Sequence, residues 1–579
     1  MKHDHSLLNR PRQAASGNGA ILVIVNGAGG YWDRYMIEET VLLALEHYGM
    51  PYRVLDLASE QIAAATLKEC AGIILAQHHL GRGLTAAAAT LIAEAVRNGV
   101  GLVNLDNDLQ EYPSPLLEIF AFDGINPHPF ATNLIRIPTN GHYITELQCA
   151  GEYHQFKQPV TGTIVEKWRQ DVVPLAEAIL GKEQLIYIRH MAPWSAFEPR
   201  NYAILFAANW GKGRAVQFTL NPRVWHKAFF GHGSGIDDLF WRSILWTVRK
   251  PFAANIIPPF VTLSVDDCSG RHDFRYMDLA VKNNYVPLIA LFLRLVPERL
   301  FPQIKEGQQS GKVQFSTHAL DYYTLLAFNF GRGECTPEEL EERFAYDAAW
   351  WKKVGTSPGA TIRFHWGEWG VQSLPYCKKL GRVFFCPAVQ TGLHDTDMNL
   401  SDGFWPYNLQ TCYYDYLPDD PDFFGFASLG PRHQEDFLTG CTANLRESDH
   451  TNIEKAAHNA ATQISHGLRS AFYGEVLTHE QKIGALDMEE WDKILKTAAG
   501  STKSFEKIFV GHDEIARYLK GKAGVTLEKS SVDGTKLHCV VSGATESPLR
   551  LSVFRNEGNS VSREYVAVKP FNGREELSG

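Results

Sequence analysis

Two adjacent carboxylates at the end of an apolar run are the side chains best placed to do chemistry. The stretch VTLSVDDCSG at 261–270 carries an apolar, β-branched run that leads Asp266 and Asp267 into a Ser/Gly turn. Neighbouring carboxylates repel each other and cost free energy to remove from water. Such a pair at the end of a buried strand indicates a bound cation or a proton-transfer role. The alternative is a polar turn with an Asx-type cap.

Two later strand ends supply nitrogen donors and a guanidinium. KVQFSTHALDYY (312–323) predicts a strand that leads to His318, and TIRFHWGEWG (361–370) contains Arg363 and His365. Arg363 and His365 are two residues apart, so on an extended segment both point to the same side. A histidine beside tryptophans is also typical of a packed or stacking residue, and that alternative stays open for His365.

A third strand end carries another histidine. SAFYGEVLTHEQ (470–481) predicts a strand that ends at His479. The alternative is that His479 only neighbours a helix N-cap, with Thr478 as the cap and Glu480 in the first turn.

Because of these strand ends and their side chains, residues 258–522 resemble the polysaccharide deacetylase superfamily, whose fold is a distorted β/α barrel. One strand of that family ends in T-F-D-D-G. TLSVDDCSG matches the acidic pair, with Cys268 and Ser269 inserted before the glycine. By this resemblance Asp266 is the general base and Asp267 binds a divalent metal ion.

The family's second motif, H-[ST]-x-x-H, supplies two histidine ligands, and this chain departs from it. If His318 is the first histidine, Tyr322 occupies the second position; if it is the second, Gln314 occupies the first. His365 is the candidate for the vacant ligand position, with Asp321 as a lesser option. One imidazole and one carboxylate alone would bind a metal ion poorly.

The resemblance also implies a mechanism. Arg363 matches an arginine that orients the base Asp266, and His479 matches a histidine that protonates the leaving group. The reaction would be metal-dependent hydrolysis of an N- or O-acetyl group on a carbohydrate. The cofactor would be a divalent ion, with zinc preferred, at the C-terminal mouth of the barrel.

Aromatic residues are the candidates for binding the carbohydrate. The stretch from about 387 to 450 is rich in aromatic and turn residues, and long loops without secondary structure are uncommon unless they carry function. Trp405 and Tyr407, with Trp366, are predicted to stack on sugar rings. They could equally close the end of a barrel.

Two other functions remain open. A glycoside hydrolase on the same barrel would pair Asp266 with a second carboxylate such as Glu368, Glu475 or Glu480. The missing histidine also allows a catalytically inactive protein that binds carbohydrate.

Residues 20–257 predict a separate α/β domain, because strands and helices alternate as in a parallel, doubly wound, flavodoxin-like sheet. AILVIVNGAGG (20–30) does not complete G-x-G-x-x-G, since Trp32 replaces the third glycine, so a dinucleotide site is not favoured. The pattern resembles glutamine-amidotransferase-like, trehalose-utilisation-type domains.

The expected nucleophile of such a domain is missing. The strand–helix elbow holds Asn104, Leu105 and Asp106, with no cysteine or serine. This domain is therefore predicted to have no catalytic activity. It would serve in recognition, as a lid, or in homo-oligomer formation. Residues 1–19 read as a disordered tail, and 523–579 as a small β-sandwich-like domain.

Composition narrows the classes of partner. The 579 residues carry a formal charge of −9 with no basic run, which argues against nucleic-acid binding. No window approaches 18 apolar residues, so no membrane span is predicted. The nine cysteines show no C-x-x-C and fit reduced thiols in the cytoplasm. A removed export signal would leave the same sequence.

Overall fold

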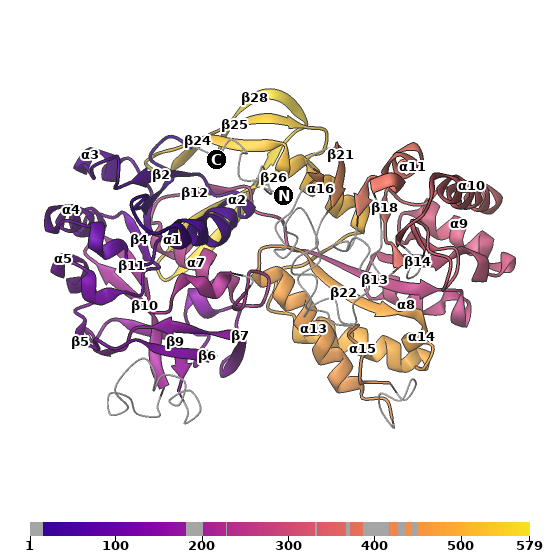
Figure 1. Cartoon of the computed structure of the whole chain (residues 1–579), viewed down its shortest axis with the longest axis horizontal. Coiled ribbons are helices and arrows are strands. Elements are labelled where there is room, and N and C mark those ends of the chain that lie inside the picture. Colours follow the sequence, from indigo (N-terminus) through magenta and orange to yellow (C-terminus); the bar gives the residue numbers. More distant parts are fainter. Residues whose placement is uncertain are drawn as a thin grey trace. The chain divides into compact units, whose positions relative to one another are not determined.

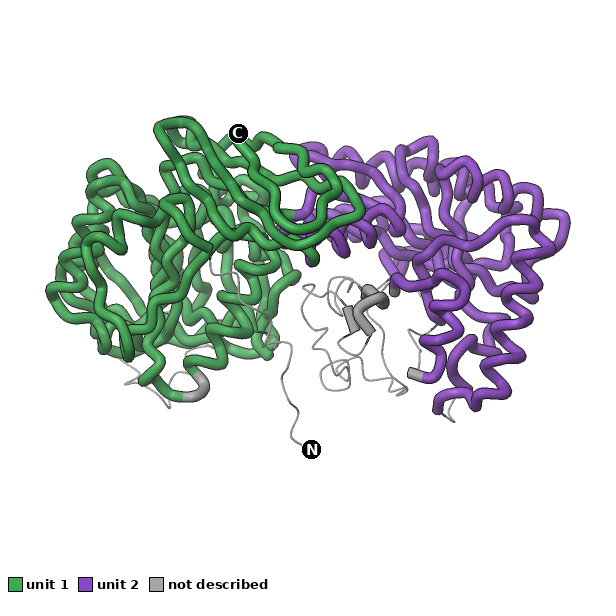
Figure 2. Tube along the Cα trace, turned by 90° about the horizontal axis from the view of Figure 1, so that it is seen from above, with its two compact units in different colours: residues 1–256, 524–579 green, residues 257–523 purple. Residues whose placement is uncertain are grey.

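The computed structural model describes residues 15–180, 201–226, 228–329, 333–365, 371–385, 416–417, 420–425, 436–442 and 450–579. The protein is a mixed α/β protein with several sheets and divides into two compact units (Figure 2). Unit 1 comprises Met1–Ile256 and Gly524–Gly579, and unit 2 comprises Ile257–Ala523. The sequence predicted residues 523–579 as a separate small domain; in the structure Gly524–Gly579 group with unit 1.

A nine-stranded sheet with the order β2-β1-β3-β4-β11-β10-β9-β6-β7 forms the centre of unit 1 (Figure 1). The first five strands in this order run parallel, and the others are antiparallel to their neighbours. The sequence predicted a parallel, doubly wound sheet over residues 20–257; five strands follow this prediction, whereas β6, β7, β9 and β10 pair antiparallel. The strands are β1 (Ile21–Val25), β2 (Tyr52–Asp56), β3 (Gly72–Leu75), β4 (Gly101–Asn104), β6 (Phe130–Ile137), β7 (Glu152–Gly162), β9 (Val173–Ile179), β10 (Asn201–Trp210) and β11 (Gly213–Phe218).

Short helices accompany this sheet. The longest of those described is α4 (Ala86–Arg97), where the Thr85 side chain accepts a hydrogen bond from Ala88 N and Gly99, at φ 113°, follows the last turn. Threonine is a preferred N-cap residue, and glycine adopts a positive φ after a helix at little cost. The other α-helices described in unit 1 are α1 (Tyr31–Met36), α2 (Leu43–His47), α3 (Ala64–Lys68), α5 (Ser114–Glu118) and α7 (Asp237–Thr247).

The C-terminal strands form two three-stranded sheets, with the orders β24-β25-β28 and β12-β26-β27. Strand β12 (Phe252–Ala254) comes from the end of the first segment and pairs antiparallel with β26. This pairing gives a physical reason for grouping the C-terminal strands with unit 1. They are β24 (Val525–Asp533), β25 (Lys536–Thr545), β26 (Leu549–Glu557), β27 (Ser560–Val568) and β28 (Phe571–Ser578).

In unit 2, five parallel strands form the sheet that carries the candidate site. Its order is β15-β14-β13-β22, and β23 also pairs with β13. The strands are β13 (Phe260–Cys268), β14 (Pro287–Phe292), β15 (Gln314–Ala319), β22 (Gly474–His479) and β23 (Ile508–Phe509). Strands β18 (Thr361–Ile362), β19 (Phe384–Phe385), β21 (Asp420–Gly425) and β20 (Tyr416–Leu417) form a second sheet. A closed barrel remains a prediction.

Helices pack around these strands, and two of them begin with a capping box. Thr336 and Glu339 cap α10 (Pro337–Val354), and Asp487 and Glu490 cap α15 (Met488–Ser501). The other α-helices described in unit 2 are α8 (Arg275–Lys282), α9 (Phe301–Ser310), α11 (Leu374–Lys379), α13 (Ile453–Arg469), α14 (Glu480–Ile483) and α16 (His512–Ala523). Within the described part of the chain, no helix combines the length and apolar character needed to cross a bilayer.

Candidate metal centre

The two adjacent aspartates lie at the end of β13, where the strand loses its regular pairing. The register with β14 shifts between Val265 and Cys268, and Asp267 adopts a left-handed backbone conformation with φ 58°. Neighbouring side chains of a regular strand point to opposite faces, and an irregularity of this kind re-aims them. Asp266 and Asp267 are both buried, and the irregular strand end lets both carboxylates serve one site.

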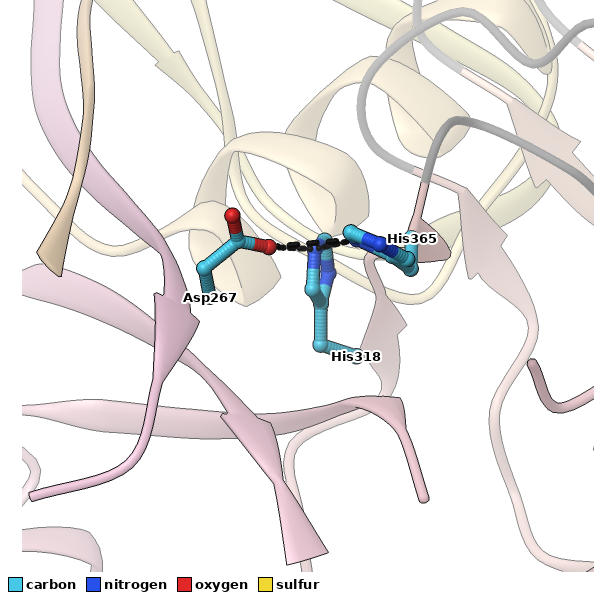
Figure 3. A group of neighbouring side chains, drawn as sticks. All are labelled: Asp267, His318 and His365. Carbon is cyan, nitrogen blue, oxygen red and sulfur yellow. Dashed lines mark hydrogen bonds and ion pairs between the residues drawn. The ribbon is translucent and has the colours of Figure 1, made fainter. Parts of the chain in front are cut away.

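Three side chains from separate strand ends bring one atom each to a common point. Asp267 Oδ1 lies 3.2 Å from His318 Nε2 and 3.1 Å from His365 Nδ1, and the two nitrogens are 3.0 Å apart (Figure 3). Atoms bound to one tetrahedral zinc ion at about 2.0–2.1 Å lie about 3.3 Å from one another. The three atoms are therefore spaced as ligands of one small divalent ion would be.

The hydrogen bonds around these atoms favour an ion over a proton at the common point. His318 Nδ1 lies 2.7 Å from the backbone oxygen of Arg363 and donates to it, so the other ring nitrogen, Nε2, is the one that can bind a cation. Asp267 Oδ1 is buried without a hydrogen-bond partner in the described structure, although both ring nitrogens are near. A buried anionic oxygen in this state is what a cation would satisfy.

The charge of Asp267 also suits a ligand role. Burial by itself raises the pKa of Asp267, but the contacts with His318 and His365 outweigh burial and hold the pKa well below its usual range. The carboxylate is therefore ionised at neutral pH. One carboxylate oxygen and two imidazole nitrogens are a donor set that zinc accepts, and three protein ligands leave a coordination position open.

Arg363 holds the second aspartate. Its Nε forms an ion pair with Asp266 Oδ1, and its Nη1 lies 3.0 Å from Glu475 Oε1. Burial by itself raises the pKa of Glu475, but the Arg363 charge, with hydrogen bonds from His512 and Ser264, lowers it to about 2. The guanidinium is 1% exposed, so this charged group fixes Asp266 in a place from which water is largely excluded.

His479 forms a hydrogen bond with Asp436, a residue that the sequence did not mark as part of the site. His479 Nδ1 lies 2.7 Å from Asp436 Oδ2, and that oxygen also accepts the backbone N–H of His479. Burial by itself lowers the pKa of His479, but the Asp436 hydrogen bond and charge, with the charges of Asp266 and Asp267, raise it to about 9. His479 is therefore a protonated imidazole at neutral pH, and its side chain is 30% exposed.

The structure separates the alternatives for the vacant ligand position. His365 joins His318, whereas Asp321 Oδ2 lies 2.8 Å from Arg294 Nη1 in an ion pair at the surface. Tyr322 packs its ring on Phe292, with centroids 4.4 Å apart. The inserted Cys268 is buried, and its thiol donates to the Val265 backbone oxygen.

Two of the three carboxylates predicted for a glycoside hydrolase have other partners in the described structure. Glu475 is bound to Arg363, as described above. Glu480 accepts hydrogen bonds from three backbone N–H groups and two hydroxyls; the donors are Ser269 N, Gly270 N, Arg271 N, Ser269 Oγ and Tyr276 Oη. Neither is placed as a free partner of Asp266. The third candidate, Glu368, and the predicted carbohydrate-binding residues Trp366, Trp405 and Tyr407 lie outside the described residues.

A second group with metal-ligand chemistry lies in unit 1, where His79, Asp108 and Glu111 approach one another. Arg82 forms ion pairs with both of these carboxylates. Because a guanidinium already neutralises them, this group fits a cation less well than the one in unit 2.

Comparisons with known proteins give only distant likenesses. No family model and no curated protein matches the sequence. A cytoplasmic protein from Salmonella typhimurium LT2 is 14% identical with a TM-score of 0.26; the match covers 40% of this chain and 100% of that one. A family 4 carbohydrate esterase from Streptomyces lividans is 9% identical with a TM-score of 0.24, covering 42% of this chain and 91% of that one.

A β-galactosidase from Rahnella sp. R3 is also among the similar structures, at 13% identity and a TM-score of 0.22. That match covers 35% of this chain and 29% of the galactosidase. TM-scores this low assign neither a fold family nor an activity to the chain.

Proposed function

We propose that unit 2 is a metal-dependent hydrolase that removes an N- or O-acetyl group from a carbohydrate. The observation that carries this proposal is the triangle of Asp267 Oδ1, His318 Nε2 and His365 Nδ1, with sides of 3.0–3.2 Å. A divalent ion held there, with zinc as the first candidate, would supply a Lewis acid that polarises a carbonyl and acidifies water.

Asp266 has the position of a general base. It lies next to Asp267 in sequence, and the Arg363 ion pair fixes its carboxylate. In the proposed reaction a water molecule adds to the acetyl carbonyl carbon, and Asp266 accepts the proton that this water loses. Arg363 acts on Asp266 as a positioning residue.

His479 has the protonation state of a general acid. Asp436 keeps the imidazole protonated at neutral pH, since the pKa of His479 is raised to about 9. When the bond between the acetyl carbon and the sugar nitrogen or oxygen breaks, His479 gives its proton to that leaving atom. The products are acetate and a free amine or hydroxyl.

The carbohydrate substrate follows from the resemblance of the Asp-Asp, Arg and His motifs to the deacetylase pattern. Homo-oligomer formation through the N-terminal segment and a cytoplasmic location remain predictions of the same kind.

The deciding experiment measures metal content and acetate release together. The full chain, purified without chelator, should contain about one equivalent of zinc or another divalent ion. It should release acetate from a panel of N- and O-acetylated oligosaccharides, and a strong chelator should abolish the release. A protein without bound divalent ion, or acetate release that is insensitive to chelation, would rule the proposal out.

A further inference from the structure

Gln481 contacts the carboxylate oxygen of Asp267 that the two histidines do not approach. Its Nε2 donates a hydrogen bond of 2.8 Å to Asp267 Oδ2. Oδ1 faces the nitrogens of His318 and His365 at 3.1–3.2 Å. The two oxygens of one carboxylate are thus divided between an amide donor and the candidate metal position.

The orientation of the Gln481 amide is fixed by chemistry. Its Oε1 is buried and has no hydrogen-bond partner in the described part of the chain. Turning the amide over would place this oxygen against Asp267 Oδ2, and two acceptors repel each other. The amide therefore keeps its N–H on Asp267, although an unpaired buried acceptor costs free energy.

The neighbouring residue holds Gln481 at this place. Glu480, the first residue of α14, binds the backbone of Ser269, Gly270 and Arg271, the loop that directly follows β13. The helix that carries Gln481 is thereby tied to the segment that carries Asp267. The hydrogen bonds of Glu480 thus place Gln481 beside Asp267, and the contact does not depend on a flexible surface side chain.

We propose that Gln481 is a positioning residue that restricts Asp267 to binding a divalent ion through one oxygen. A carboxylate free to bind with both oxygens would fill an additional coordination position, which substrate needs. Gln481 occupies Oδ2 and so keeps that position open. This inference rests on the proposed function, because it requires an ion at the triangle.

Two substitutions test the inference with cobalt(II) in place of the resident ion. Gln481→Met removes the donor at similar volume, and Gln481→Asn keeps the amide but withdraws it by one methylene group. Outer-shell partners typically contribute about 10–100-fold to metal affinity. We expect both variants to raise the dissociation constant for the ion within this range. We also expect them to weaken the visible absorption of bound cobalt, because its coordination number increases.

Gln463→Met is the matched control. Gln463 is a buried glutamine of unit 2 whose Oε1 accepts a hydrogen bond from Leu477 N at 3.1 Å. Its loss should lower thermal stability and leave the cobalt spectrum unchanged. Circular dichroism identifies any variant that fails to fold. If Gln481→Met does not fold, Gln481→Asn alone serves as the test.

The outcomes separate this inference from the proposed function. A wild-type cobalt spectrum in both folded Gln481 variants overturns the inference alone, provided that the wild type binds the ion and Asp267→Asn does not. A wild-type protein that binds no ion overturns the inference and the proposed function together.

Discussion

Asp266 and His479 are Cα partners across the parallel strands β13 and β22. The proposed base and acid therefore lie at the same level of the sheet, one at the end of each of two neighbouring strands. Arg363 binds the first and Asp436 binds the second, so each reacting group has a separate partner that fixes its position. Each proton transfer can therefore be tested by a substitution of its own, although the Asp266 charge also contributes to the raised pKa of His479.

Replacing Asp266 with Asn should abolish most turnover while metal content stays near the wild-type level. An amide cannot accept the proton of the attacking water, and general-base catalysis typically contributes about 10²–10⁴-fold. Acetate release and metal analysis on the same preparation check this. Asp321→Asn is the matched control, because Asp321 pairs with Arg294 and accepts backbone hydrogen bonds of its own loop from Tyr323 and Thr324, and the variant should keep near-wild-type turnover. Full activity in the Asp266 variant would exclude it as the base.

Replacing Asp436 with Asn should move the alkaline limit of activity to lower pH. The pKa of His479 is raised from 6.5 to about 9, so the protonated acid, and any stability it contributes, is lost as pH rises through about 9. Without the Asp436 charge this limit should fall toward 6.5. The pH profile of kcat for both proteins measures the shift. An unchanged alkaline limit would show that Asp436 does not set the pKa of the proton donor.

The sequence predicted the strand ends that carry the site, because an apolar run followed by a polar or glycine turn is a local signal. It placed Asp267, His318 and His365 as candidate ligands, and the structure brings these three together. The joint position of Asp267 and His318 follows from a general property of parallel sheets: the carboxyl ends of the strands meet at one edge. His365 follows β18 of the second sheet, so its approach to the other two is a tertiary contact.

Other parts of the site depend on tertiary contacts that no local pattern encodes. Asp436 lies 43 residues before its partner His479, and neither its neighbours nor its spacing marks it. Gln481 has no charge and would pass as an ordinary residue of a helix. The left-handed conformation of Asp267 is equally hidden, since regular alternation would place two adjacent aspartates on opposite faces.

Replacing His365 with Ala should weaken metal binding at least about 100-fold, because two remaining protein ligands hold a divalent ion poorly. Tyr322→Phe provides the matched control at the position where the family motif would have its second histidine. Its ring packing on Phe292 survives the change, so its metal affinity should stay within about twofold. Titration with zinc against a competing chelator measures both. Equal affinities in the two variants would remove His365 from the ligand set.

Replacing Glu475 with Gln should destabilise unit 2 and flatten its response to acid. The pKa of Glu475 is lowered from 4.5 to about 2, so its ionised form stabilises the fold above pH 4.5, and this stability is lost as pH falls through about 2. At neutral pH the loss of this charge beside buried Arg363 should cost roughly 3 kcal/mol. Urea unfolding of the full chain between pH 7 and pH 2 measures both effects. Glu454→Gln, at an exposed position in the first turn of α13, should behave like the wild type within about 0.5 kcal/mol. An acid dependence in the Glu475 variant as steep as in the wild type would show that this carboxylate does not hold Arg363 in place.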